Sequence, residues 1–168
     1  VSVEGTANIL DLAHHQPLVC MSSSAVYGLH RNESVSERDA CSEDEVLAYD
    51  GGLPGYATGK LHMEQLALSA AAGGQQVLLV RPFNVVGIGQ SSHYGMVIPT
   101  FVRQALLGDP IEIHGDGLQT RSFCDVDKFA RIFRQLVESP VPWDASLRIV
   151  NVGNPIQTQI LDLAHLVL

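Results

Sequence analysis

A helical stretch between two short apolar runs is the feature that most constrains how this 168-residue chain folds. Residues 18–21 and 77–80 are apolar, as buried strands of a parallel sheet are. Between them, residues 55–72 place leucines at helical spacing and end at Gly73-Gly74. Parallel strands need a crossover connection, which is usually a helix. The pattern therefore predicts a βαβ unit within an α/β fold.

The remaining pattern predicts further helices and strands on both sides of this unit. We expect a helix over 2–14, a long acidic surface loop over 29–54, and a loop at 87–95. Further on, the pattern predicts helices at 97–107 and 127–138, strands at 111–114 and 147–150, and a last helix over 159–168 capped by Thr158.

Composition excludes several classes of function. The net charge of −8 argues against a nucleic-acid-binding protein, and no Lys/Arg cluster offsets it. No apolar run reaches the ~18 residues of a membrane span, and the chain does not begin with an export signal, so we expect a cytoplasmic protein without membrane contact. Cys20, Cys41 and Cys124 lack metal-site spacing and are expected to be reduced thiols. Scattered histidines, including His14-His15 at a predicted helix end, indicate no metal site.

Tyr56 and Lys60 carry the clearest chemistry. Four residues apart on a helix, they share one face of its first turn. An ammonium close to a phenol stabilises the phenolate, which can then take a proton from an alcohol while the carbon gives up a hydride. A serine at the end of the strand 18–21 could hold the alcohol oxygen. Alone the motif is weak, because a surface tyrosine beside a solvated lysine has the same spacing.

Several segments in the same order resemble the extended short-chain dehydrogenase/reductases, specifically the NAD-dependent epimerase/dehydratase family that acts on nucleotide sugars. The matching segments are VEGTANILDLA at 3–13, SSSAVYG at 22–28, YATGKLHMEQL at 56–66, RPFNVVG at 81–87, VIPTFVRQALLGDPIEIHGDGLQTRSFCDVD at 97–127 and IVNVGN at 149–154. The resemblance implies an α/β fold in which 1–90 form the C-terminal part of an NAD-binding domain with a Rossmann-like doubly wound parallel sheet, its N-terminal Gly-rich βαβ unit missing. It also implies a mainly substrate-binding subdomain over 91–168, with 147–168 partly returning to the sheet.

The resemblance implies a catalytic set of Ser23, Tyr56 and Lys60. Tyr56 would be the acid/base at a sugar hydroxyl, Ser23 would hold that oxygen, and Lys60 would also contact the nicotinamide ribose. Ser24 remains an alternative to Ser23 and a candidate substrate contact.

The cofactor implied by the resemblance is NAD, with NADP not excluded. Ser22, Tyr56, Lys60, Pro82 and Phe83 would contact it. The family's Gly-rich turn, G-x-x-G-x-x-G, stands nowhere in this sequence. We therefore interpret the chain as an internal fragment of a longer enzyme, which by itself would bind NAD weakly or not at all.

The substrate implied by the resemblance is a nucleotide-diphosphate sugar. Asn84 and Arg121 would reach the diphosphate, and Val97 with residues 112–114, His114 included, would line the base. The alternative for Asn84 is a turn residue, and for Arg121 a surface salt bridge to Asp125 or Asp127.

Departures from the family pattern narrow the choice among the reactions that the family catalyses. Sugar 4,6-dehydratases carry Asp-Glu where this chain has Ser24-Ala25, and the sugar-acid decarboxylases carry Glu at the Ala25 position. Both reactions need that carboxylate for proton transfer beyond the hydride step. The missing carboxylate therefore points to epimerisation or simple reduction more than to dehydration, and the leading hypothesis is an NAD-dependent nucleotide-sugar 4-epimerase. The alternatives are a nucleotide-sugar reductase and a catalytically inactive binding protein, and the family implies a homodimer formed through a helix pair that includes 55–72.

Overall fold

The computed structural model describes residues 2–13, 16–28, 34–39, 42–52, 54–92, 95–139 and 147–168. The expectations for His14, His15 and Cys41 lie outside these residues. The chain divides into two compact units, each with its own packing. Unit 1 comprises Val1–Pro82 and Gln135–Val152, and unit 2 comprises Phe83–Arg134 and Gly153–Leu168. Residues 83–90, which the sequence assigned to the sheet-bearing part, thus belong to unit 2.

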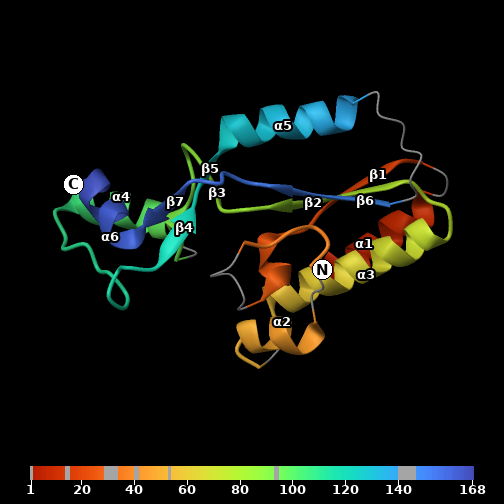
Figure 1. Ribbon diagram of the computed structural model, residues 1–168, viewed down its shortest axis with the longest axis horizontal. Helices are drawn as coiled ribbons and strands as arrows, with labels where there is room; N and C mark the ends of the chain where they lie inside the picture. The colour runs from red at the N-terminus through yellow and green to blue at the C-terminus, as the bar shows by residue number, and fades with distance from the viewer. Residues whose placement is uncertain are drawn as a thin grey trace. The chain divides into compact units, whose positions relative to one another are not determined.

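Unit 1 is built on a parallel sheet of three strands, β1 (Leu18–Met21), β2 (Val77–Pro82) and β6 (Leu147–Val152), in the order β1-β2-β6 (Figure 1). Leu18 pairs with Val77, and Val77 pairs with Leu147. The central strand β2 is buried over its first five residues, which explains its continuous apolar run. The predicted α/β fold with a Rossmann-like parallel sheet is confirmed.

The helix between the first two strands, α3 (Tyr56–Ala72), lies along this sheet, and α1 (Ser2–Leu12) lies beside it (Figure 1). The alanines Ala67 and Ala71 of α3 pack on Val77 and Leu79 of β2, because small side chains let a helix approach a strand closely. α3 ends at Gly73. Gly74 follows with a φ of 94°, a conformation that glycine adopts without strain, so the predicted helix and its stop are confirmed.

The predicted loop over 29–54 is wrong in part, because it contains a helix, α2 (Glu43–Tyr49). The Ser42 hydroxyl caps this helix by accepting a hydrogen bond from the backbone N–H of Glu45. Val46 is fully buried between α3 and a 3-10 turn, η1 (Ser24–Tyr27). The local signal was a Ser-x-x-Glu sequence at 42–45, which is a capping box.

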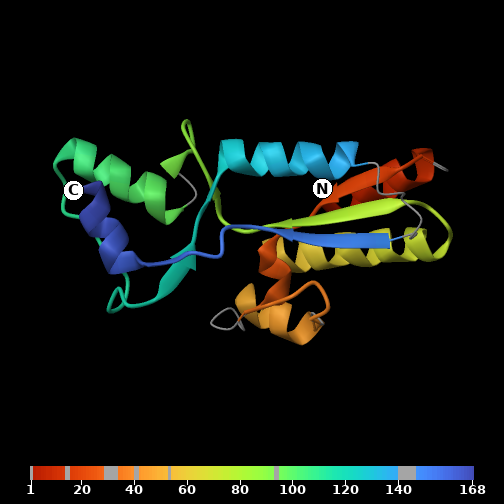
Figure 2. The same cartoon turned by 45° about the horizontal axis from the view of Figure 1, so that its top comes forward.

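Unit 2 is held by two helices, α4 (Val97–Leu107) and α6 (Ile160–Val167), which pack side by side (Figure 2). Its strands are short: β3 (Val85–Val86) runs parallel to β5 (Cys124–Asp125), and β4 (Thr120–Ser122) runs antiparallel to β7 (Gln157–Gln159). A further helix, α5 (Val126–Glu138), begins in unit 2. Of the helices described, not one combines the length and the apolar character that crossing a membrane requires.

Two predictions in unit 2 are wrong. Residues 111–114 do not form a strand, because Ile111 and Ile113 pack against the α4–α6 cluster and meet no partner strand. Thr158 does not cap the last helix, because it lies in β7 opposite Arg121. The residue before α6 is Gln159, whose side chain makes no capping hydrogen bond.

Candidate active site

Tyr56 and Lys60 lie together on the first turn of α3, as their spacing predicts. The Lys60 Nζ atom lies 5.9 Å from the centroid of the Tyr56 ring, and Tyr56 is 64% exposed. The same Nζ atom donates a hydrogen bond of 2.7 Å to the carbonyl of Met21, the last residue of β1. The ammonium is therefore held at the carboxyl end of the sheet, where parallel α/β sheets bind ligands.

Asp50, which the sequence did not single out, holds the N-terminus of α3. Its carboxylate accepts hydrogen bonds from the backbone N–H groups of Gly55, Ala57 and Thr58 at 3.1, 3.2 and 2.7 Å, and from the Thr58 hydroxyl at 2.7 Å. A Cβ atom at Gly55 would lie 2.9 Å from the Asp50 Cγ atom, so glycine gives the carboxylate its access. This cap reaches the helix from five residues before its N-cap, a spacing that no local pattern signals.

The Asp50 carboxyl has a lowered pKa. Desolvation by burial pushes that pKa upward, but the hydrogen bonds from Thr58, Ala57 and Gly55 favour the charged form more strongly. The negative charge also suits the positive end of the α3 dipole.

The three serines after β1 have different surroundings. Ser22 is 3% exposed and donates its hydroxyl hydrogen to Glu64. Ser23 is partly exposed and caps η1, with its Oγ atom accepting from the Ala25 N–H at 3.1 Å. Because that bond uses an acceptor lone pair, the Ser23 hydroxyl hydrogen can still be donated to a ligand. Ser24 is 6% exposed, so Ser23 is the more accessible of the two candidate hydroxyls.

A buried polar network stands behind these residues. Arg81, at 4% exposure, donates to both carboxylate oxygens of Glu64 from Nε at 2.9 Å and from Nη2 at 2.7 Å. Its Nη1 atom donates to the Tyr27 hydroxyl at 2.7 Å, and that hydroxyl donates to Asn151 at 2.8 Å. Together with Ser22, which directly follows β1, the network joins η1, α3, β2 and β6.

The surroundings of Arg81 and of Cys20 shift the pKa of each side chain. Burial alone would lower the pKa of Arg81, but its hydrogen bonds and charge interaction with Glu64 outweigh burial and raise that pKa. Burial raises the pKa of the Cys20 thiol, and the nearby Lys60 charge opposes this only in part. This network was not predicted from the sequence, although Glu64 stands one turn after Lys60 on the same face of α3.

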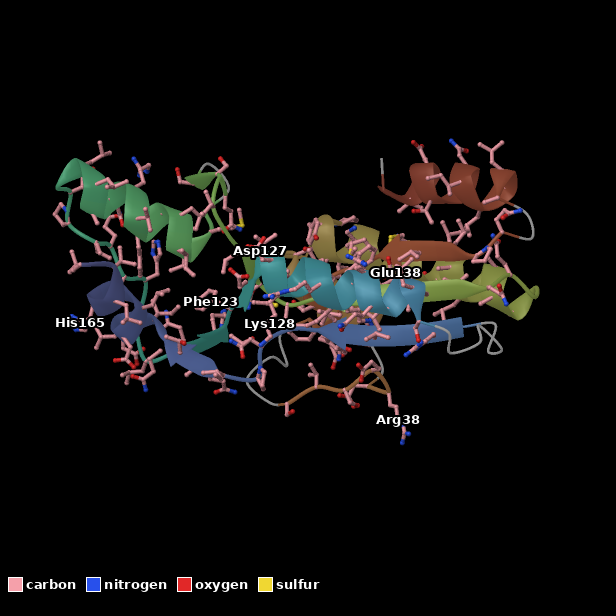
Figure 3. All side chains as sticks on the ribbon, turned by 90° about the horizontal axis from the view of Figure 1, so that it is seen from above. Arg38, Phe123, Asp127, Lys128, Glu138 and His165 are labelled. Atoms are coloured by element: carbon pink, nitrogen blue, oxygen red, sulfur yellow. The ribbon has the colours of Figure 1, made fainter. Side chains whose placement is uncertain are left out.

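In unit 2, Asn84 and Arg121 both make local contacts. Asn84 has a φ of 38°, as a turn residue does, and its Nδ2 atom donates to the Ser122 carbonyl at 2.9 Å. Arg121 is exposed on β4 and donates to the Thr120 carbonyl at 2.9 Å. Within the described residues it forms no ion pair with a carboxylate. Asp125 instead caps the start of α5, where Figure 3 labels Asp127 and Lys128.

The other predicted contacts in unit 2 are spread over separate segments. Val97 opens α4 and is partly buried against the α4–α6 cluster. His114 is exposed, with its carbonyl accepting from Gln119 at 2.9 Å. Phe83 lies against Gly153, where an added Cβ atom would come within 2.8 Å of the Phe83 Cβ atom.

The predicted residues thus fall into two groups. Ser22, Ser23, Ser24, Tyr56, Lys60 and Pro82 belong to unit 1, whereas Phe83, Asn84, Val97, His114 and Arg121 belong to unit 2. In unit 1, Ser23 lies two residues after Met21 of β1, and Pro82 lies two residues after Val80 of β2. Met21 and Val80 are paired, so Ser23 and Pro82 both lie at the carboxyl edge of the sheet. An exposed phenol, an ammonium and a serine hydroxyl there supply donors that fit a ribose or another hydroxyl-rich ligand.

Comparison with known proteins places these residues in a family. The chain is 36% identical over 154 residues to a dTDP-4-dehydro-6-deoxy-D-allose reductase of Streptomyces, covering 90% of this chain and 44% of that protein. It is 32% identical over 168 residues to a UDP-N-acetyl-alpha-D-glucosaminuronate decarboxylase of Bacillus cytotoxicus, covering 96% and 49%. The chain spans about half the length of the curated relatives it matches or less.

The fold matches solved structures over a similar share. The crystal structure of a UDP-glucuronic acid 4-epimerase from Bacillus cereus in complex with NAD has a TM-score of 0.81 and 25% sequence identity, covering 96% of this chain and 49% of that one. The family model of the NAD dependent epimerase/dehydratase family matches residues 1–153. Since this match covers most of the sequence, the chain belongs to the NAD-dependent epimerase/dehydratase family.

Proposed function

We propose that the complete protein is an NAD-dependent nucleotide-sugar 4-epimerase with Tyr56 as its acid/base. The proposal is supported by the exposed phenol of Tyr56, the ammonium of Lys60 beside its ring and the partly exposed hydroxyl of Ser23. All three belong to unit 1.

Each of these residues has a definite role in the proposed reaction. NAD⁺, when bound, supplies the acceptor and then the donor of one hydride. The Tyr56 phenolate accepts the proton of the sugar 4-hydroxyl as the carbon–hydrogen bond at the same carbon breaks. Ser23 donates a hydrogen bond to that oxygen, and the Lys60 ammonium lies beside the Tyr56 ring. Tyr56 would return the proton to the same oxygen once the hydride is given back to the other face of the sugar, so no net oxidation would occur.

The single observation that carries the proposal is the surroundings of Ala25. Its methyl group is buried with Val46, Ala57 and Leu61, so an apolar cluster occupies the position at which the family resemblance implies Glu in dehydratases and decarboxylases. A methyl group transfers no proton. Position 25 therefore provides no acid/base group for a step beyond hydride transfer, which argues against dehydration and decarboxylation, whereas neither epimerisation nor keto reduction needs such a group.

For the substrate, we propose a nucleotide-diphosphate sugar. Arg121 is exposed, and its planar guanidinium suits a diphosphate. Asn84 would contact the same diphosphate, and Val97 and His114 would line the base.

A second candidate function is a nucleotide-sugar reductase. It is favoured by the 36% identity to a dTDP-4-dehydro-6-deoxy-D-allose reductase. Tyr56 would then donate a proton to a keto oxygen, and the reduced cofactor would be consumed with each turnover.

The test is turnover of the full-length protein with UDP- and dTDP-hexoses, followed by product separation and by nicotinamide absorbance. A 4-epimer formed with a catalytic amount of NAD⁺ and no accumulating NADH supports the epimerase. A steady loss of NAD(P)H with a 4-keto sugar establishes the reductase instead. Nucleotide-sugar binding without turnover would indicate an inactive binding protein, and formation of a dehydrated or decarboxylated sugar would contradict the argument from Ala25.

We also propose a homodimer formed through α1 and α3. Ile9 and Leu12 of α1 and Leu68 of α3 are exposed apolar residues on these two neighbouring helices. Replacing Leu12 and Leu68 by glutamate should shift the full-length protein to monomer in sedimentation, whereas an unchanged mass would overturn this dimer.

A further inference from the structure

The face of α3 that carries Tyr56 and Lys60 continues to a buried carboxylate. Tyr56, Lys60 and Glu64 are spaced four residues apart, so their side chains form one stripe along the helix. Tyr56 at one end is exposed, whereas Glu64 is 2% exposed and bonded to Arg81 through both carboxylate oxygens.

This stripe is tied to the end of β1 at two points. Lys60 donates to the Met21 carbonyl, and Ser22, the next residue, donates to Glu64. Ser23 follows directly and presents the candidate hydroxyl. The network therefore joins the segment that carries Ser23 to the helix that carries Tyr56 and Lys60.

We propose that Glu64 and Arg81 are positioning residues, which set the rotation of α3 and thereby the placement of Tyr56 and Lys60 relative to Ser23. This inference rests on the proposed function only for its effect on turnover, because the placement itself can be measured without a substrate.

The geometry gives rotation a large effect on the site. Side chains reach about 5–6 Å from a helix axis, so a rotation of about 10° moves their ends by roughly 1 Å. A misplacement of about 1 Å can lower a catalytic rate by roughly 10²-fold. The two hydrogen bonds between Arg81 and Glu64 resist such rotation, since turning the helix would lengthen both of them.

A contribution to stability does not by itself explain why Glu64 and Arg81 form a buried ion pair. Replacing both partners of a buried pair by apolar residues is often neutral or stabilising, because desolvation of the two charges is costly. Replacing Glu64 and Arg81 together by apolar residues should therefore disturb the placement of Tyr56 and Lys60 while leaving the free energy of unfolding nearly unchanged.

The experiment compares the full-length wild type with the double variant Glu64→Leu/Arg81→Met. The thermal midpoint of the double variant should stay close to that of wild type, its kcat should fall by about 10²-fold, and its KM should change by less than about threefold. Gln104→Leu, which removes a buried polar side chain of α4 in unit 2, is the matched control and should leave kcat unchanged.

The second readout needs no activity. Lys60 and Lys128 are the two lysines of this chain, and the exposed Lys128 at the start of α5 in unit 2 serves as an internal reference (Figure 3). In the double variant the rate of Lys60 acetylation, relative to that of Lys128 and measured by peptide mass spectrometry, should rise several-fold, because Lys60 loses its fixed contact with Met21.

Wild-type kcat together with a wild-type Lys60 acetylation ratio in the double variant would overturn the positioning role. If the double variant does not fold, Glu64→Gln takes its place, because it removes the charge of Glu64 and weakens its two hydrogen bonds with Arg81 while keeping the shape of the side chain. Unchanged kcat and an unchanged Lys60 acetylation ratio in Glu64→Gln would equally overturn the positioning role. If wild type turns over no nucleotide sugar, the proposed function fails, while the acetylation ratio still decides the positioning role.

Discussion

The candidate residues of unit 1 and those of unit 2 are held in different ways. In unit 1, Tyr56 and Lys60 stand on a 17-residue helix whose N-terminus is capped by Asp50. In the third turn of this helix, Glu64 accepts hydrogen bonds from Arg81. In unit 2, Asn84 and Arg121 lie on a turn and a three-residue strand, and their side chains donate to backbone carbonyls.

The difference matches what each group would do. Proton transfer needs reacting groups held to within about 0.5 Å, which favours side chains on regular elements with a supporting polar shell. Binding a diphosphate through a long guanidinium tolerates more adjustment, since one side chain can follow the anion. We therefore expect unit 1 variants to act on kcat and unit 2 variants to act on KM.

The largest effect is expected for Tyr56→Phe in the full-length protein. Loss of the acid/base hydroxyl should lower kcat by about 10²–10⁴-fold. Stability should not change, because the side chain is largely exposed. Tyr49→Phe, at an exposed tyrosine of α2, is the control in the same turnover assay. Near-normal turnover by Tyr56→Phe would remove the acid/base role.

Ser23→Ala and Ser24→Ala sharpen the comparison within unit 1. Ser23→Ala should lower kcat by about 10²-fold, as loss of one donor to a reacting oxygen does, whereas Ser24→Ala should change kcat by less than about threefold. Steady-state kinetics of both variants decide between the two hydroxyls. The reverse order of effects would assign the role to Ser24 in spite of its burial.

Arg121→Ala should act on binding. Removing a charge-assisted contact to a diphosphate should raise KM for the nucleotide sugar by about tenfold or more, with kcat little changed. Arg103→Ala, at an exposed arginine of α4 in the same unit, should leave KM unaltered. Equal KM values for the two variants in substrate titrations would argue against a diphosphate contact at Arg121.

The smallest effect is expected for Asp50→Asn, which weakens the cap of α3. At neutral pH the free energy of unfolding should fall by about 1 kcal/mol, as for other helix caps. Because the pKa of Asp50 is lowered in the folded protein, its contribution is complete above the ordinary value of about 3.9 and is lost as pH falls through the folded value. Urea unfolding of wild type and variant at neutral and acidic pH measures this, and a stability difference that persists in acid would contradict the cap.

Signals that act over a few residues predicted much of this fold. Apolar runs and helical spacing were enough for β1, α3 and β2, and the four-residue spacing was enough to place Tyr56 beside Lys60. The same kind of signal failed at 111–114, where alternating apolar residues pack against helices and pair with no strand. Alternation reports a half-buried segment, and only its neighbours decide whether it becomes a strand.

The sequence by itself determined the βαβ unit and the shared face of Tyr56 and Lys60, because each depends on residues close together in the chain, and it determined the family through short motifs that occur in the same order along the chain. Tertiary structure alone decided which serine is accessible, how Asp50 caps α3, and that Glu64 meets both Ser22 and Arg81. Ser22 and Glu64 are 42 positions apart, and Tyr27 and Asn151 are 124 apart. Contacts at such separations exist only once the sheet has brought its strands together, so no local pattern encodes them.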